Sequence, residues 1–255
     1  MILNRKRLLG LTAILFVIFE SIMFYLIHIE MADPDAKMRY ECIIAATVFS
    51  WLTLVIELVT ARSEGETPLQ IIFSKSNGNF IRIAMIFTLV ADYYMVAADE
   101  IDNLTGITVF LGTQLFIFLH ILVNDASIKG RTANIVCRIL LTAVAILIAH
   151  LILGNDADKM AIISVIYYAN LCVNAIFAHR IKRGGILLTV GLVLFALCDI
   201  NVGLTGLSSI YTDELSEGSL LYRLTNTNVD LIWLFYIPSQ TLIPLTLLTS
   251  SKNNE

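Results

Sequence analysis

Charged residues are scarce in this chain. They make up 15% of its 255 residues, whereas apolar residues make up 57%. Soluble domains carry about 25% charged and about 45–50% apolar residues, so the composition indicates a membrane protein. The formal net charge is −4, and no strip of lysine and arginine with interleaved aromatics occurs. We therefore expect no nucleic-acid partner.

The motifs of the common metal, nucleotide and serine enzymes are also missing. No HExxH, CxxC, GxSxG or Walker-type sequence occurs, so zinc, phosphate-loop and serine-elbow chemistry are not indicated. The 4 histidines lie near the ends of apolar runs, and the last run has no lysine for a retinal Schiff base. The 4 cysteines are scattered among the apolar runs, as small core hydrophobes are. We expect neither a metal nor an organic cofactor.

The chain consists mainly of apolar runs, each close to the length of about 20 residues that a helix needs to cross a bilayer. They predict an all-α fold, a polytopic membrane helix bundle of about eight transmembrane helices, in a single transmembrane domain over residues 1–255. The predicted spans lie near residues 8–29, 40–60, 80–98, 104–123, 134–153, 160–179, 185–208 and 229–249.

Basic residues orient this bundle. Most of the 17 lysines and arginines fall on one side, which the positive-inside rule makes cytoplasmic. Both termini are then expected in the cytoplasm, and this requires an even number of spans. We expect a multi-pass integral protein of a bacterial-type plasma membrane. The basic residues on the predicted cytoplasmic side are Arg5, Lys6, Arg7, Arg62, Lys75, Arg82, Lys129, Arg131, Arg138, Arg180, Lys182, Arg183 and Lys252.

Two aspartates, Asp92 and Asp199, lie inside apolar runs. Both runs cross from the cytoplasmic side outward, and the carboxylates lie about 12 and about 14 residues into them, which are similar depths. A charge in hydrocarbon costs ~2.5–3.5 kcal/mol, so both side chains are expected to face the bundle interior. Two close carboxylates cannot easily both ionise, so the pair offers one acid and one base. The alternative is that each aspartate only holds helices together.

Other polar residues are candidates for the same interior site. Trp233, Tyr236 and Gln240 have the spacing i, i+3 and i+7, which places them on one helix face. A second set on one face of the span near 160–179 comprises Tyr167, Asn170 and Asn174. The two asparagines either contact substrate or form interhelical hydrogen bonds. The remaining candidates for lining or orienting roles are Tyr93, Gln114 and Asn201.

These elements resemble the YhhN family of lysoplasmalogenase-like integral membrane proteins over roughly residues 80–248. The motifs are Ala91–Asp92, Cys198–Asp199 in FALCDINVGL, and the aromatic and glutamine element WLFYIPSQTLI. The chain resembles a divergent member. The family's glycine before the first aspartate is Ala91 here, and its KPL element corresponds to Thr67–Pro68–Leu69, which lacks the lysine.

The resemblance implies hydrolysis of the vinyl-ether bond of a lysoplasmalogen, or a related lysolipid, to a fatty aldehyde and a glycerophospho head group. It carries over Asp92 and Asp199 as the catalytic pair, a membrane lipid as the substrate, and no cofactor. Two other function classes stay open from the residues themselves. One is a carboxylate-dependent small transporter, and the other is a non-catalytic lipid-binding membrane protein. Nothing in the sequence indicates an oligomeric state.

Overall fold

The structure is a computed structural model that describes residues 4–30, 36–61, 67–72, 78–154, 157–210 and 230–250. Nearly all of these residues are helical. Two five-residue π-helices, η1 (Leu26–Glu30) and η2 (Tyr93–Ala97), directly continue α1 and α4. The α-helices are α1 (Arg5–Tyr25), α2 (Ala36–Ala61), α3 (Pro68–Ile72), α4 (Asn79–Asp92), α5 (Asn103–Asn124), α6 (Ile128–Leu153), α7 (Lys159–Ala178), α8 (Gly185–Ile210) and α10 (Leu231–Ser250).

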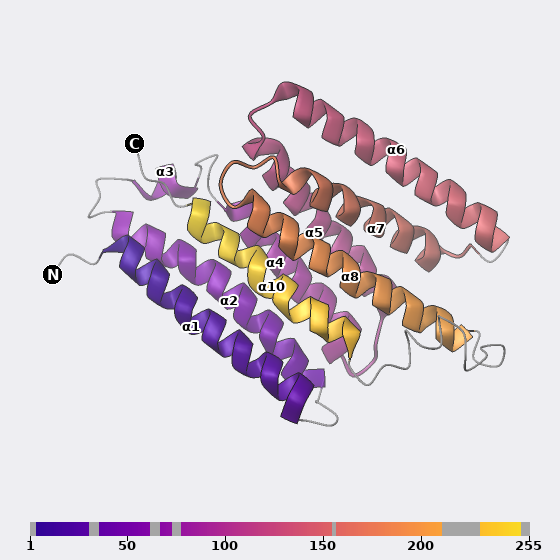
Figure 1. Ribbon diagram of the computed structural model, residues 1–255, viewed down its shortest axis with the longest axis horizontal. Helices are drawn as coiled ribbons and strands as arrows, with labels where there is room; N and C mark the ends of the chain where they lie inside the picture. Colours follow the sequence, from indigo (N-terminus) through magenta and orange to yellow (C-terminus); the bar gives the residue numbers. More distant parts are fainter. Residues whose placement is uncertain are drawn as a thin grey trace.

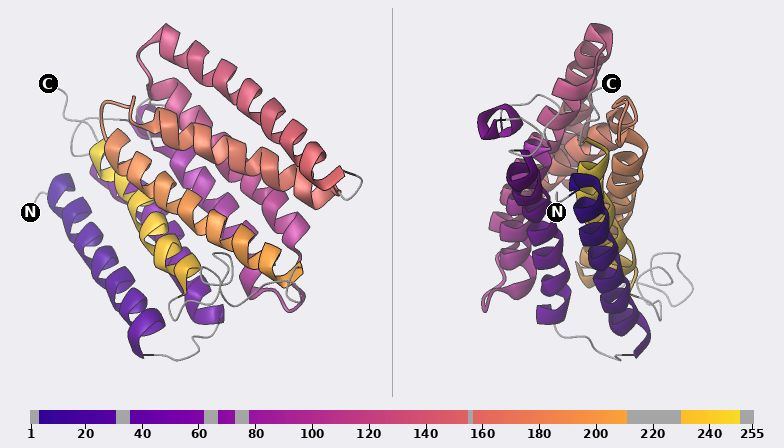
Figure 2. Two further views of the ribbon diagram at one scale, coloured as in Figure 1. Left: turned by 45° about the vertical axis from the view of Figure 1, so that its right-hand side comes forward. Right: turned by 90° about the vertical axis from the view of Figure 1, so that its left-hand side faces the viewer.

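The long helices run side by side along one common direction (Figure 1). Helices α1 and α6 form opposite edges of the bundle, and α10 lies between α2 and α8 and contacts both. Turned views show the short α3 outside the bundle, at the end where α1 begins (Figure 2). In α6 only 6% of the most apolar stretch is buried, so most of its surface would face lipid.

Eight helices among the described residues are long and apolar enough to cross a membrane. This confirms the predicted polytopic helical bundle of about eight spans. The first span begins and the last one ends at the same end of the bundle (Figure 1), as an even number requires. That this end is cytoplasmic stays a prediction, as do the type of membrane and the single domain over 1–255. The basic residues Arg62, Lys75, Arg223 and Lys252 lie outside the described residues.

The predicted and observed bounds differ most at the fifth span. It was expected near 134–153, but α6 begins at Ile128. The polar stretch before residue 134 resembles a loop, yet the Ser127 side chain accepts a hydrogen bond from the N–H of Gly130 (3.2 Å) and caps the helix. As a result Arg138, expected near the end of a span, lies well inside α6.

Side-chain caps start several other helices in the same way. Asn4 accepts from the N–H of Lys6 at the start of α1, and Asp102 accepts from Thr105 at the start of α5. Asp158 accepts from Ala161 at the start of α7. Each cap satisfies one of the N–H groups that a helix start leaves unpaired. The helix starts are therefore set by side-chain hydrogen bonds as well as by the hydropathy of the sequence.

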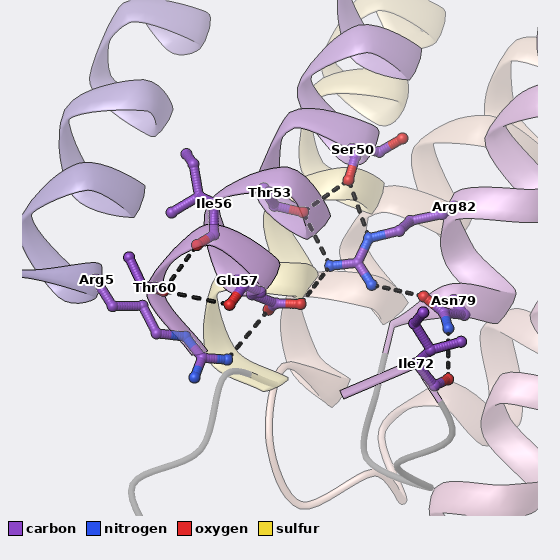
Figure 3. A network of polar contacts seen from close by, with 9 residues as sticks. All are labelled: Arg5, Ser50, Thr53, Ile56, Glu57, Thr60, Ile72, Asn79 and Arg82. Atoms are coloured by element: carbon purple, nitrogen blue, oxygen red, sulfur yellow. Dashed lines mark hydrogen bonds and ion pairs between the residues drawn. The ribbon is translucent and has the colours of Figure 1, made fainter. Parts of the chain in front are cut away.

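A buried polar network joins α1, α2 and α4 at the end of the bundle where α1 begins (Figure 3). Arg82 is 1% exposed, and each of its guanidinium nitrogens donates a hydrogen bond. Its acceptors are the carbonyl of Ser50 (3.0 Å), Oδ1 of Asn79 (2.8 Å), Oγ1 of Thr53 (3.0 Å) and Oε2 of Glu57 (3.0 Å). Arg5 lies 3.8 Å from the other oxygen of Glu57. This Arg82–Glu57 network therefore pairs a buried cation with a carboxylate.

Candidate functional site

The helix type changes at Asp92. Helix α4 ends at this residue and continues as η2, in which the carbonyl of Tyr93 accepts from the N–H of Ala98, five residues on (2.7 Å). The hydroxyl of Tyr40 donates to the carbonyl of Leu89 (3.1 Å), so α2 holds the last turn of α4. Single π-turns inside helices are frequent at functional sites. The backbone at Asp92 thus differs from that of an ordinary span.

Asp92 and Asp199 each accept a hydrogen bond from a tyrosine of a different helix. Tyr236 of α10 donates to Oδ2 of Asp92 (2.5 Å), and Tyr167 of α7 donates to Oδ2 of Asp199 (2.6 Å). Asp92 is 4% exposed, and Asp199 of α8 is partly buried. The two carboxylates belong to different helices, α4 and α8. We call these four residues the aspartate–tyrosine cluster.

Aromatic rings join the two halves of this cluster. The ring of Phe195 lies 5.4 Å from that of Tyr236 and 6.5 Å from that of Tyr167, between centroids. Phe110 lies 5.7 Å from both Tyr167 and Phe195. These are the spacings of tilted and edge-to-face aromatic pairs. The carboxylates therefore lie beside an apolar wall supplied by α5, α7, α8 and α10.

The predicted residues Gln114, Asn170 and Asn174 form a separate group about a cation of α6. Nη1 of Arg138 donates to Oδ1 of Asn170 (2.5 Å), and Nη2 donates to Oδ1 of Asn174 (2.7 Å) and Asn134 (3.4 Å). Asn174 in turn donates to Oε1 of Gln114 (2.9 Å). We call Gln114, Asn134, Asn170 and Asn174 the amide cluster. It connects α5, α6 and α7.

Trp233 and Gln240 extend the aspartate–tyrosine cluster along α10. The Trp233 ring is 6% exposed and lies edge-to-face with Tyr236, 5.3 Å between centroids. The guanidinium of Arg39 lies 5.4 Å from this ring and pairs with Asp230 (3.0 Å). Gln240 is 1% exposed, and neither atom of its amide has a hydrogen-bond partner. The buried face of α10 therefore carries an unsatisfied amide one turn from the tyrosine.

Two of the predicted residues make their described contacts with groups other than the carboxylates. Tyr93 is 47% exposed and packs its ring against Tyr40, 6.4 Å between centroids. Asn201 donates to the carbonyl of Leu197 in its own helix (2.7 Å). Both had been placed near an aspartate because they are close to it in sequence. Residues one or two apart on a helix point in different directions, and a role for either residue in the site stays a prediction.

A third intramembrane acid, Glu20, belongs to another site. It is 3% exposed, and neither of its oxygens has a hydrogen-bond partner. The nearby thiol of Cys42 makes its hydrogen bond to the carbonyl of Met38 (3.9 Å). Glu20 lines a pocket of about 290 Å³ between α1 and α10. Tyr236 does not line this pocket, so Glu20 is separate from the aspartate–tyrosine cluster.

Sequence reasoning missed several residues of the site. Tyr167 had been placed on one face with Asn170, but its bond to Asp199 depends on how α7 packs on α8. Phe110 and Phe195 have no signal that separates them from other core aromatics. Arg138 was assigned to the water boundary because the start of its helix was placed too late. An earlier start, indicated by the Ser127 cap, would have placed this cation inside the helix and not at its end.

The aspartate–tyrosine cluster offers two carboxyl groups, two phenols and an apolar wall. Paired carboxyl groups in different surroundings are suited to acid–base chemistry. Within the part of the chain that the structure describes, no group of three or more His, Cys, Asp and Glu side chains is arranged to hold a metal ion.

Comparison with known proteins adds a family to this geometry. A model of the YhhN family matches residues 49–247. The match includes both aspartates, both tyrosines of the cluster, Arg138 and the amide cluster. No curated protein and no solved structure matches the chain.

Proposed function

The chain belongs to the YhhN family, and we propose that it is an integral-membrane hydrolase that cleaves the vinyl-ether bond of lysoplasmalogens or of a related lysolipid. The main support is the pair Asp92 and Asp199, two carboxylates on different helices whose tyrosine partners both pack against the Phe195 ring. Each is bonded to a tyrosine. Intramembrane carboxylates are costly, and they usually mark function.

The chemistry of a vinyl ether suits such a pair. Protonation of the outer alkene carbon leaves an oxocarbenium ion at the carbon attached to oxygen. Water adds to that carbon, and the resulting hemiacetal breaks its bond to the glycerol oxygen. The products are a fatty aldehyde and a glycerol hydroxyl on the head group. A neutral carboxyl supplies the first proton, and an ionised one stabilises the cation and takes a proton from water.

The hydrogen bonds from the tyrosines are compatible with one carboxyl group acting as acid and the other as base, because each tyrosine bonds to only one oxygen of its carboxyl group. Tyr236 bonds to Oδ2 of Asp92, and Tyr167 bonds to Oδ2 of Asp199. Neither Oδ1 takes part in a hydrogen bond among the described residues, so each carboxyl group keeps an oxygen for substrate or water. The buried rings of Phe110 and Phe195 make the surroundings of the two tyrosines apolar.

The departures from the family motifs do not disturb the carboxyl pair directly. Ala91, in the place of the family's glycine, is 0% exposed, so its methyl group is accommodated in the core. Thr67 lies just before α3, at the end where α4 begins (Figure 1). Asp92 is thirteen residues beyond the start of α4 at Asn79, or about 20 Å along the helix. The missing lysine therefore bears on head-group preference more than on proton transfer.

Aldehyde release by the purified protein tests the proposal. Incubation with a 1-alkenyl lysophospholipid should yield fatty aldehyde, whereas the saturated 1-alkyl analogue should yield none. Asp92→Asn and Asp199→Asn should each lower the rate by at least about 100-fold, since general acid–base groups contribute about 10²–10⁴-fold.

Asp99→Asn is the matched control because Asp99 is exposed beyond η2, and it should retain full activity. Wild-type protein that releases no aldehyde, or aspartate variants that remain fully active, would contradict the proposal. Carboxylate-dependent flux in liposomes without hydrolysis would favour a transporter instead.

A further inference from the structure

Arg138 is a cation inside a helix long and apolar enough to cross a membrane, and it has no carboxylate partner among the described residues. It is ten residues beyond the first residue of α6, Ile128, or about 15 Å along the helix. The ion pairs among the described residues do not include it. By contrast, the more deeply buried Arg82 lies 3.0 Å from Glu57. Charged side chains at such depth normally pair with an opposite charge.

The surroundings of Arg138 orient the guanidinium but do not neutralise it. Its bonds go to the amide oxygens of Asn134, Asn170 and Asn174, and the Phe118 ring lies 4.1 Å from its central carbon. Asn170 and Asn174 precede the end of α7 at Ala178 by eight and four residues, or about 12 and 6 Å. Asn134 is four residues nearer the start of α6 than Arg138 is, so the guanidinium reaches back towards the end of the bundle where α6 begins and α7 ends.

Two buried donors beside this cation have no acceptor. Among the residues that the structure describes, neither Nε of Arg138 nor Nε2 of Gln114 has a hydrogen-bond partner. Gln114 is 1% exposed, and its oxygen is already bonded to Asn174. A buried donor without an acceptor costs about 1–3 kcal/mol. An anion with several acceptor oxygens would both pair with this cation and accept hydrogen bonds from the two free donors.

We infer that Arg138 and the amide cluster bind the phosphate of a single-chain phospholipid whose ether group reaches Asp199. The inference rests on the proposed function and names the residues of this chain that would hold the head-group phosphate. Tyr167, the partner of Asp199, precedes Asn170 by three residues and Asn174 by seven on α7, or about 4.5 and 10.5 Å along the axis.

The dimensions of such a lipid agree with this spacing. In a lysolipid with the ether at one end of glycerol, five single bonds separate the ether oxygen from phosphorus, a reach on the order of 6 Å. The phosphate would lie nearer the end of the bundle where α7 ends. By the charge rule this end is cytoplasmic, so the lipid would enter from the cytoplasmic leaflet with its head group on that side.

Binding measurements test the inference without any need for turnover. The probes are a 1-alkyl lysophospholipid, which has no vinyl ether to hydrolyse, and the matching 1-alkylglycerol, which has no phosphate. Arg138→Gln should weaken binding of the phospholipid by about 10-fold or more, the loss of one charge-assisted contact. It should leave binding of the alkylglycerol unchanged. Arg131→Gln removes a cation nearer the start of α6, and this control should alter neither.

Turnover provides a second comparison in which the two proposals fail separately. If the protein releases aldehyde, Arg138→Gln should lower kcat/KM for the alkenyl lysophospholipid and spare that for the alkenylglycerol. If it releases none, the proposed function fails, and the alkyl-lipid binding data still decide the role of Arg138. Equal losses for both ligands, or no loss, would overturn the inference.

Two further variants and one competitor complete the test. Arg138→Lys keeps the charge and should restore part of the binding of the phospholipid. Gln114→Leu removes one of the free donors and should weaken binding of the phospholipid but not of the alkylglycerol. It replaces Arg138→Gln in the test if that variant does not fold. Inorganic phosphate separates the two sources of this anion. If it binds to the wild type as tightly as the phospholipid does, the lipid assignment is wrong.

Discussion

Replacing Glu57 by leucine measures what the Arg82–Glu57 network contributes to folding. Arg82 is 1% exposed, and its Nη2 lies 3.0 Å from Oε2 of Glu57. Breaking a buried ion pair costs about 3–5 kcal/mol because the remaining charge stays buried. The contact between Glu57 and Arg5 is longer, 3.8 Å, and adds at most about 1 kcal/mol. We therefore expect Glu57→Leu to lower the free energy of unfolding by about 3–5 kcal/mol.

Unfolding in mixed micelles of a mild detergent and a denaturing one, followed by the loss of helix signal, gives this free energy. Glu41→Leu is the matched control, because Glu41 is an exposed acid of the same helix. It should change the free energy of unfolding by no more than about 0.5 kcal/mol. The difference between the two variants then reports the buried charge and not the loss of an acid from α2.

The double variant Glu57→Leu with Arg82→Met decides whether the pair itself is the cause. Replacing both partners of a buried ion pair by apolar residues is often neutral, so the double variant should recover most of the loss. The reasoning is refuted if Glu57→Leu costs less than about 1 kcal/mol, the value of a surface pair. It is refuted equally if the double variant is as unstable as the sum of the two single variants, which would mean no coupling.

The same unfolding measurement in mixed micelles tests the packing at Gly112 and the ion pair of Asp125. A Cβ atom at Gly112 would overlap the ring of Phe87, so Gly112→Ala should cost about 1–3 kcal/mol, whereas Gly10→Ala meets no atom within 4 Å and should be neutral or stabilising. Burial raises the pKa of Asp125, but the bond from Arg180 (2.7 Å) and nearby positive charge outweigh it, so the pKa lies below its ordinary value. Its stabilisation is complete above the unfolded pKa of about 3.9 and is lost as the pH falls through the folded pKa. The stability advantage of wild type over Asp125→Asn should therefore shrink between about pH 5 and strongly acidic pH, and an unchanged gap would contradict this.

The sequence was sufficient to predict the helices because hydropathy and length are local properties. Each long apolar run became a helix that can cross a bilayer. The error at the start of α6 also has a local cause. The stretch from Ser127 to Asn134 contains lysine, glycine and arginine, and resembles a loop, whereas the Ser127 cap and helix continuity make it the first two turns of α6. Hydropathy alone does not detect caps.

The candidate site was predictable in depth but not in its contacts. Asp92 and Asp199 could be predicted to lie at similar depths in the membrane. The rise per residue gives the depth of each along its helix, and the distribution of basic residues gives the direction in which each helix crosses. Their bonds to Tyr236 and Tyr167 depend on the rotation of four helices about their axes, which the sequence does not specify. The π-helix after Asp92 has no sequence signal of its own. Tyr93 shows the consequence, since it follows Asp92 in the chain and yet is 47% exposed.

Arg82 and Arg138, both predicted at the cytoplasmic boundary, differ in how many of their hydrogen bonds and ion pairs the protein supplies. Arg82 has a carboxylate, and all three of its nitrogens donate to described acceptors, so the fold itself accounts for its burial. Arg138 has only amide oxygens and keeps Nε without a partner. Arg138 is half-buried, and a charge partly removed from water without a counter-charge is costly unless a ligand supplies one. The two arginines differ in the partners that the protein supplies to their guanidinium groups. This difference, and not depth or residue type, makes Arg138 the candidate for binding a ligand and Arg82 a structural residue.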